Sequence, residues 1–252
     1  MSHHSEHAAE HTPEAIRDRL SSGVSQDYLK DSVYGAIDGA VTTFAVVSSV
    51  AGAGLSSGIV VVLGLANLLA DGISMASGNF IGTRAENQAA DKAKREEELE
   101  VEHHPEGERE EIRQIFSRKG FEGETLEKVV EVITADKSRW VRIMLQEEHG
   151  IGPDRPRALR AAIVTFVSFI LIGAIPLAAY LADLIQPGLV ERPFAVACIL
   201  TAISFAIIGS FKARVVGLNQ FKGVLETLSI GALASGLAYG IGYLLRPFAE
   251  GL

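Results

Sequence analysis

A run of acidic residues near the middle of the chain is its densest group of side chains able to do chemistry. Between Glu96 and Glu111 the sequence holds nine carboxylates and one arginine, Arg109. A solvated helix face normally mixes both charges at a spacing of three or four residues. This run cannot neutralise its own negative charge, because it contains only one cation. The run is either a merely soluble acidic stalk or a site for divalent cations.

Pro105 favours the cation site, because it divides the run into two helices and lets the second fold back beside the first. Glu97 and Glu100 are three residues apart, as are Glu108 and Glu111, and this spacing puts each pair on one helix face. Periodicity does not choose Glu97 over its acidic neighbours.

A methionine in a later predicted helix bears on which cation such a site would take. Carboxylates alone suit Ca²⁺ and Mg²⁺ as well as Mn²⁺ and Fe²⁺. Met144 lies four residues before Glu148, and a thioether ligand favours a softer metal. A methionine next to Trp140 on an apolar face is more often a core residue, so this signal is weak by itself.

Five apolar stretches are long enough to cross a membrane as helices. They cover residues 33–54, 58–82, 159–184, 193–211 and 224–245. Small residues are common in them, as in Gly35-x-x-x-Gly39 and Gly236-x-x-x-Gly240, and such residues let membrane helices pack closely. Pro176 should kink the third stretch. The sequence therefore predicts an all-α integral membrane protein with five transmembrane helices.

Polar side chains interrupt the first two spans. Asp38 lies in the first, and Asn67, Asp71 and Met75 recur every fourth residue along one face of the second. A charge at the membrane centre costs about 2.5–3.5 kcal/mol, and the interiors of the spans hold no lysine or arginine. One explanation for Asp38 and Asp71 is that their carboxylates exchange a proton for a cation, a function that would justify this cost. The alternative is that both lie near the membrane surface, where water hydrates them.

Residues 84–157 form a polar insert between the second and third spans. The second span continues as a stalk to His104, and Gly120 and Gly150 act as stops. The further helices are predicted over residues 105–119, 123–134 and 136–149. The apolar residues that can form a small core are Ile112, Ile115, Phe116, Val129, Val130, Ile133, Trp140, Ile143 and Leu145. The insert is therefore expected to be a compact domain of three or four helices.

The first 32 residues are predicted to be a tail with a short amphipathic helix, Pro13–Leu20, and no signal peptide is evident. His3, His7 and His11 could share a helix face, although so short a polar tail is more simply disordered. The expected parts are the tail (1–32), spans 1 and 2 (33–83), the insert (84–157) and spans 3 to 5 (158–252).

Lysine and arginine near the span ends predict the orientation. They concentrate in the tail, beside the insert and in the loop 212–222, whereas the other side has only Arg192 and Arg246. The amino terminus and the insert are thus expected in the cytoplasm. The formal charge of −8 argues against nucleic acid as a partner. The single cysteine, Cys198, excludes a disulfide framework.

Taken together, the sequence resembles the vacuolar iron transporters of plants and their yeast and bacterial relatives. The resemblance covers the chain after the tail. It rests on Asp38-Gly39, Gly72-Ile73-Ser74-Met75, Lys94-Arg95-Glu96-Glu97, the acidic residues around Pro105, and Trp140 with Met144 and Glu148. It implies a homodimer with the ion path at the subunit interface, and proton-coupled movement of Fe²⁺ or similar ions out of the cytoplasm.

The resemblance also assigns residues. It implies Asp38 and Met75 as ligands along the path. It implies a cytoplasmic metal-binding domain that uses Glu97, Glu100, Glu108, Glu111, Met144 and Glu148. The sequence departs from the plant pattern at Asn67, where those relatives carry a carboxylate, and Asp71, one turn on, could replace it.

We therefore expect a bacterial-type inner-membrane exporter, not an enzyme, that exchanges Fe²⁺ or Mn²⁺ for protons and holds no permanent cofactor. Two alternatives remain. Glu100-x-x-His103 suggests a ferritin-like di-iron oxidase, but that site needs two such motifs on a four-helix bundle. The other alternative is a membrane-tethered metal sensor or buffer, for which five spans with a polar stripe are more than an anchor needs.

Overall fold

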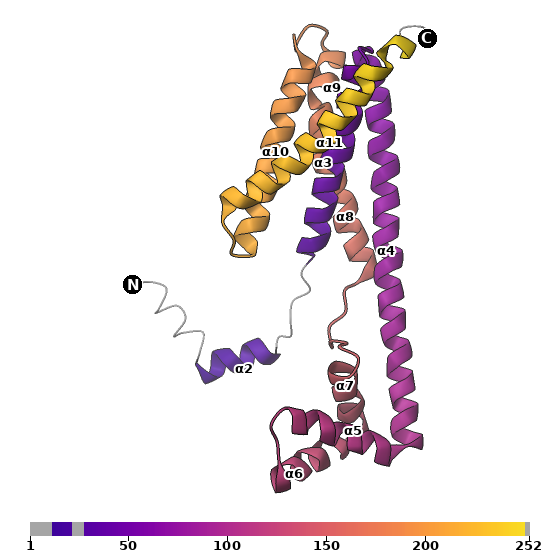
Figure 1. Ribbon diagram of the computed structural model, residues 1–252, viewed down its shortest axis with the longest axis vertical. Helices are drawn as coiled ribbons and strands as arrows, with labels where there is room; N and C mark the ends of the chain where they lie inside the picture. Colours follow the sequence, from indigo (N-terminus) through magenta and orange to yellow (C-terminus); the bar gives the residue numbers. More distant parts are fainter. Residues whose placement is uncertain (1–11, 22–27, 250–252) are drawn as a thin grey trace. The chain divides into compact units, whose positions relative to one another are not determined.

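The computed structural model describes residues 12–21 and 28–249, and the regular secondary structure there is helical (Figure 1). The helices are α2 (Pro13–Ser21), α3 (Leu29–Gly52), α4 (Ser57–His103), α5 (Pro105–Arg118), α6 (Gly123–Thr134), α7 (Lys137–Glu147), α8 (Ala158–Gly173), η1 (Ile175–Leu177), α9 (Ala178–Ile185), α10 (Pro193–Val215) and α11 (Gln220–Ala249). His3, His7 and His11 lie outside the described residues, whereas the predicted short helix in the tail is present as α2.

Five helical stretches are long and apolar enough to cross a membrane, which confirms the predicted all-α fold with five spans. They are Leu29–Gly52, Ser57–His103, Ala158–Ile185, Pro193–Val215 and Gln220–Phe248. The third is interrupted at Pro176, which lies in the 3-10 turn η1 between α8 and α9. Proline has no N–H for the helical hydrogen bond, so the predicted kink appears as a break.

The chain divides into two compact units, and α4 contributes to both. The membrane unit contains the described residues 28–82 and 157–249. The insert unit contains residues 83–156 together with α2. At 1.5 Å per residue the 47 residues of α4 extend about 70 Å, more than twice the hydrocarbon thickness of about 30 Å. The polar second half of α4 must therefore lie in water.

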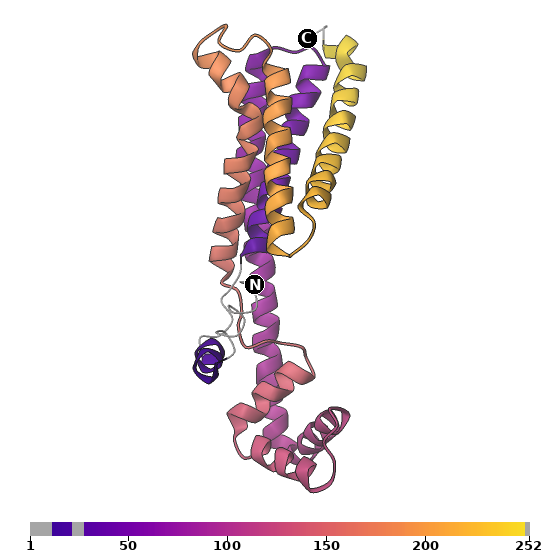
Figure 2. The same ribbon diagram turned by 90° about the vertical axis from the view of Figure 1, so that its left-hand side faces the viewer.

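Within the membrane unit, α3 lies next to α8, α10 and α11 (Figures 1 and 2). Gly35 and Gly39 make the contact with α8 possible, since a Cβ atom at either would meet the backbone oxygen of Thr165 or Phe169. The predicted packing role of this motif is confirmed. The second motif behaves differently, because a Cβ at Gly236 or Gly240 would meet no described atom within 4 Å. Close packing by these two glycines is not seen within the chain.

The insert unit has its own apolar core, which α4, α5, α6 and α7 build together. The residues predicted for it are all present, and Val101, Leu126, Val141 and Met144 join them. Helices α5 and α7 end two or three residues before glycines with a left-handed backbone, Gly120 (φ 92°) and Gly150 (φ 66°). Asp136 caps α7 by accepting a hydrogen bond of 2.7 Å from the backbone N–H of Arg139.

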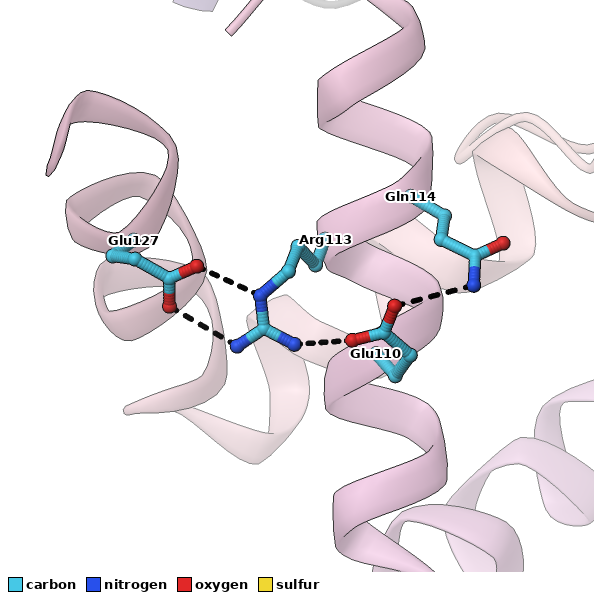
Figure 3. Close-up of polar contacts among 4 residues, drawn as sticks. All are labelled: Glu110, Arg113, Gln114 and Glu127. Carbon is cyan, nitrogen blue, oxygen red and sulfur yellow. Dashed lines mark hydrogen bonds and ion pairs between the residues drawn. The ribbon is translucent and has the colours of Figure 1, made fainter. Parts of the chain in front are cut away.

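Arg113 links α5 to α6 on the surface of the insert unit (Figure 3). Its Nε donates to Glu127 Oε1 at 2.8 Å and its Nη2 to Glu127 Oε2 at 3.0 Å, while Nη1 pairs with Glu110 on α5. Gln114 also donates to Glu110, at 3.2 Å. A bidentate pair of this kind fixes geometry more than it stabilises, because both partners are solvated.

We predict that Gly35→Ala destabilises the membrane unit by about 1–3 kcal/mol, because the added methyl group would meet the α8 backbone, which cannot yield as a side chain can. Thermal unfolding of the full chain in detergent measures the effect. Gly78→Ala is the matched control, since a Cβ at Gly78 meets open space. Equal melting of Gly35→Ala and the wild-type protein would show that this contact is not tight.

Candidate metal-binding site

The polar end of α4, the start of α5 and the end of α7 carry the carboxylates that the sequence singled out. The structure brings one oxygen each of Glu97, Glu100 and Glu108 within 4.8 Å of one another. A second group joins Glu97 to Glu148 and His149 by the same criterion. The two groups share Glu97. Both lie entirely within the insert unit.

The two central carboxylates are buried without adequate partners. The exposed fraction is 1% for Glu97 and 6% for Glu108. Among the described residues, neither Glu97 Oε2 nor Glu108 Oε2 has a hydrogen-bond partner. A buried charge is costly unless it is paired or coordinates a metal. A cation between these oxygens would remove that cost.

Burial resolves the ambiguity that periodicity left between Glu97 and its neighbours. Glu96 and Glu98 face solvent and pair with Lys92 and Lys94, at 3.4 and 3.7 Å. The acidic run thus cannot neutralise itself, as predicted, but cations outside it neutralise part of it. Glu102 and Glu110 pair in the same way with Lys137 and Arg113.

The carboxylates left over are the candidate ligands. Within the part of the chain that the structure describes, none of Glu97, Glu100, Glu108 and Glu111 forms an ion pair with lysine or arginine. Glu96, Glu98, Glu102 and Glu110 are therefore paired with cations, whereas the four candidate ligands are not. This difference is what a cation site requires of its protein ligands.

Burial and the charges of neighbouring carboxylates raise the pKa values of Glu97, Glu108 and Glu111. Burial raises the pKa of Glu108 to about 7, and the charges of Glu111 and Glu97 add to the effect. The pKa of Glu97 is also raised, first by burial, although a hydrogen bond from His149 opposes the shift. Burial and the charge of Glu148 raise the pKa of Glu111. A carboxylate near half protonation at neutral pH exchanges its proton for a cation easily.

His149 is a candidate ligand that sequence reasoning missed. Its Nε2 lies 3.0 Å from Glu97 Oε1, and this hydrogen bond raises the pKa of the imidazole. The sequence placed His149 at the end of a helix, but α7 ends at Glu147 and His149 lies beyond its cap. Its position directly after Glu148 was the available signal. A nitrogen ligand would favour transition metals over Ca²⁺ and Mg²⁺.

Met144 and His103 lie in different environments. Met144 is fully buried in the apolar core of the insert unit, one helical turn before Glu148. His103 is exposed, its Nδ1 lies 2.8 Å from the carbonyl of Leu99, and it belongs to neither carboxylate group. The Glu-x-x-His spacing at Glu100 therefore does not place its histidine among the candidate ligands. This weakens the di-iron interpretation.

In the membrane unit, Asp38 on α3 and Asp71 on α4 are half-buried and close enough to interact electrostatically. Met75 is half-buried against the apolar core of this unit. Asn67 lines a pocket of about 620 Å³ between α3 and α4, and its buried Nδ2 has no partner in the described residues. The polar stripe of α4 thus faces α3, at least at Asn67 and Asp71.

Comparison with known proteins places these residues in a wider context. A model of the VIT family matches residues 29–243. The chain is 36% identical over 219 residues to a vacuolar iron transporter of Toxoplasma gondii, covering 84% of this chain and 72% of that protein. It is 30% identical over 206 residues to vacuolar iron transporter 1 of Arabidopsis thaliana, with 81% of each chain covered. A vacuolar iron transporter of Plasmodium falciparum is 30% identical over 219 residues, which cover 84% of this chain and 80% of that protein.

We predict that the stability of the metal-free insert falls as the pH rises. Glu108 keeps its proton in the folded state up to about pH 7, whereas the same group loses it near 4.5 when unfolded. This contribution is complete below the lower pKa and is lost as the pH rises through the higher one. Hydrogen exchange of the α5 amides in the full chain, expressed as protection factors, measures it between about pH 5 and about pH 8.

Glu108→Gln should make this pH dependence shallower, because the amide stays neutral while keeping the shape of the side chain. Part of the dependence should remain, because the pKa values of Glu97, Glu111 and His149 are raised as well. Glu106→Gln, at an exposed position of the same helix, should leave it unchanged. An equally steep dependence in Glu108→Gln would show that another group causes it.

We also predict that metal binding can be followed through Trp140, the single tryptophan of the chain, which is buried in the core of the insert unit. Anaerobic titration with Fe²⁺, or with Mn²⁺, should quench its fluorescence. Glu97→Gln should weaken the apparent affinity by about tenfold, or about 1.4 kcal/mol, because Glu97 belongs to both groups. Glu98→Gln, one residue away and paired with Lys94, is the control, and equal affinities of the two variants would contradict the site.

Proposed function

The chain belongs to the VIT family, and we propose on this basis that it transports iron across a membrane. The protein is a multi-pass integral membrane protein, and relatives in parasites and plants carry the name vacuolar iron transporter. The observation that carries the proposal is the pair of buried carboxylates, Glu97 and Glu108, whose free oxygens demand a cation.

In this proposal residues 84–157 are a metal-binding domain on the cytoplasmic side that collects the ion. The carboxylates of Glu97, Glu100 and Glu108 form one ligand group, and Glu97, Glu148 and His149 offer a second. Glu111 adds negative charge beside them. A divalent ion that binds here displaces the proton of Glu108, so collection of the ion is coupled to pH from the first step.

Transfer across the membrane uses the polar residues of the first two spans. Asp38 and Met75 are the ligands of the path in this proposal, with Asn67 and Asp71 beside them. A carboxylate that binds a proton when the ion leaves keeps the charge inside the membrane low, which links export of the metal to entry of protons. Asn67 is neutral, so Asp71 supplies the second carboxylate near Asp38.

The rest of the proposal concerns the oligomeric state of the protein and the membrane in which it works. The transporter works as a homodimer with the path between the subunits, in the inner membrane of a bacterium, and carries Fe²⁺ or Mn²⁺ out of the cytoplasm. The excess of lysine and arginine beside the insert and in the loop 212–222 supports the orientation. A sensor or buffer tethered to the membrane would bind the same ions without moving them.

We predict that proteoliposomes containing the protein take up Fe²⁺ when a pH gradient is imposed, and that Asp38→Ala abolishes this uptake. The reason is that the variant loses the carboxylate that alternates between proton and ion. Fe²⁺ and Mn²⁺ should be compared in the same vesicles under anaerobic conditions.

Two controls make the result specific. The variant should still bind Fe²⁺ in the insert, as quenching of Trp140 reports, because Asp38 lies in the membrane unit. Glu191→Gln, at an exposed position between α9 and α10, should transport normally. Binding without flux in the wild-type protein would favour the tethered sensor, and normal flux in Asp38→Ala would remove that residue from the path.

A further inference from the structure

A second pocket lies between α3, α10 and α11, away from the polar stripe of α4. Its volume is about 420 Å³, within the range of about 300–1,000 Å³ that is usual for pockets that hold small molecules. All of its lining residues belong to membrane-spanning helices, and most of them are apolar. The pocket is therefore surrounded by the hydrocarbon interior of the bilayer. The helices that frame it run side by side in Figures 1 and 2.

One wall of the pocket is aromatic. The rings of Phe44 and Phe194 are stacked with centroids 6.4 Å apart, and Phe194 and Tyr239 are stacked at 5.7 Å. Phe205 closes another part of the lining, and its ring lies against Gly231. Stacked rings from three helices thus form one continuous wall of the pocket.

One hydroxyl group in the lining is buried and has no hydrogen-bond partner among the described residues. Ser48 is buried, with 1% of its surface exposed, and its Oγ lacks a hydrogen-bond partner there. The hydroxyl groups of two other lining residues behave differently: Thr201 donates to the carbonyl of Ala197 at 2.7 Å, and Ser235 to that of Gly231 at 2.6 Å. Leaving a buried hydroxyl without a hydrogen-bond partner destabilises the folded state. A ligand with one acceptor oxygen would remove this cost.

The length and depth of the pocket fit one leaflet of a bilayer. Its lining on α11 extends from Leu228 to Tyr239, a rise of about 16 Å, and one leaflet contributes about 15 Å of hydrocarbon. Ser48 lies one turn before the end of α3 at Gly52, next to the turn into α4. It is therefore near the level where the ester groups of lipids meet the hydrocarbon, at the membrane surface where α3 ends and α4 begins.

We propose that this pocket binds one acyl chain of a membrane phospholipid, whose ester carbonyl oxygen accepts a hydrogen bond from Ser48. The chain enters past the stacked rings of Phe44 and Phe194 and ends beside Phe205 and Leu228. The proposal also explains Gly236, which lines the pocket although its Cβ position is empty for 4 Å. Glycine at this position leaves room for the lipid instead of bringing two helices of the chain together.

The test uses a phospholipid with a photoactivatable group near the end of its acyl chain, incorporated with the full-length protein into lipid nanodiscs. After illumination, the lipid adducts are mapped on peptides of α10 and α11 by mass spectrometry. We expect adducts near Phe205 and Leu228 in the wild-type protein and their loss in Gly236→Leu, because leucine fills the pocket. Gly240→Leu is the matched control, since Gly240 also has open space around it but does not line the pocket, and it should label like the wild type.

A second comparison does not depend on filling the pocket. The wild-type protein should retain an ester-linked phospholipid in preference to its ether-linked analogue, which lacks the carbonyl oxygen, and Ser48→Ala should lose this preference. Equal labelling of Gly236→Leu and Gly240→Leu, or adducts confined to other faces, would overturn the proposal. Crosslinks from the pocket to a second copy of the chain, without lipid adducts, would overturn it as well.

Discussion

Burial of carboxylates that lack cationic partners is the constraint on which the insert depends. Glu97 and Glu108 are held against each other by the apolar core of the insert unit, and their free oxygens have no hydrogen-bond partner in the described residues. Such an arrangement costs free energy that the core must offset. The cost falls when a proton or a metal ion binds, so the same packing that stabilises the insert also creates its affinity for cations.

The membrane unit repeats this arrangement with fewer groups. Asp38 and Asp71 interact electrostatically between α3 and α4, and Asn67 nearby has an unpaired amide nitrogen. In our proposal, the insert and the spans therefore handle the ion by one principle, in which a carboxylate is neutralised alternately by a proton and by a metal. The continuous helix α4 supplies residues to both sets, Glu97 to the first and Asp71 to the second.

Much of the fold could be predicted because its signals are local. Apolar length defines the spans, and proline and glycine end the helices, as at Pro105 and Gly120. What could not be predicted depends on how helices turn toward one another. Sequence spacing left Glu97 equivalent to its neighbours, because only packing against α5 decides which of them is buried. His149 was missed because it lies beyond a helix end, where periodicity gives no direction. Gly236 was assigned to helix packing because a small residue beside a helix and one beside a pocket look the same in sequence.

The most direct test of the central claim is to count the protons released when Fe²⁺ binds to the full-length protein in detergent, in weakly buffered anaerobic solution near pH 7. Since burial raises the pKa of Glu108 to about 7, we expect binding to release protons, and we expect the release to become smaller at higher pH, where this group is already ionised. Tight binding with no release of protons near pH 7 would contradict it, because the ion would then occupy a site that is not built from these buried carboxylates.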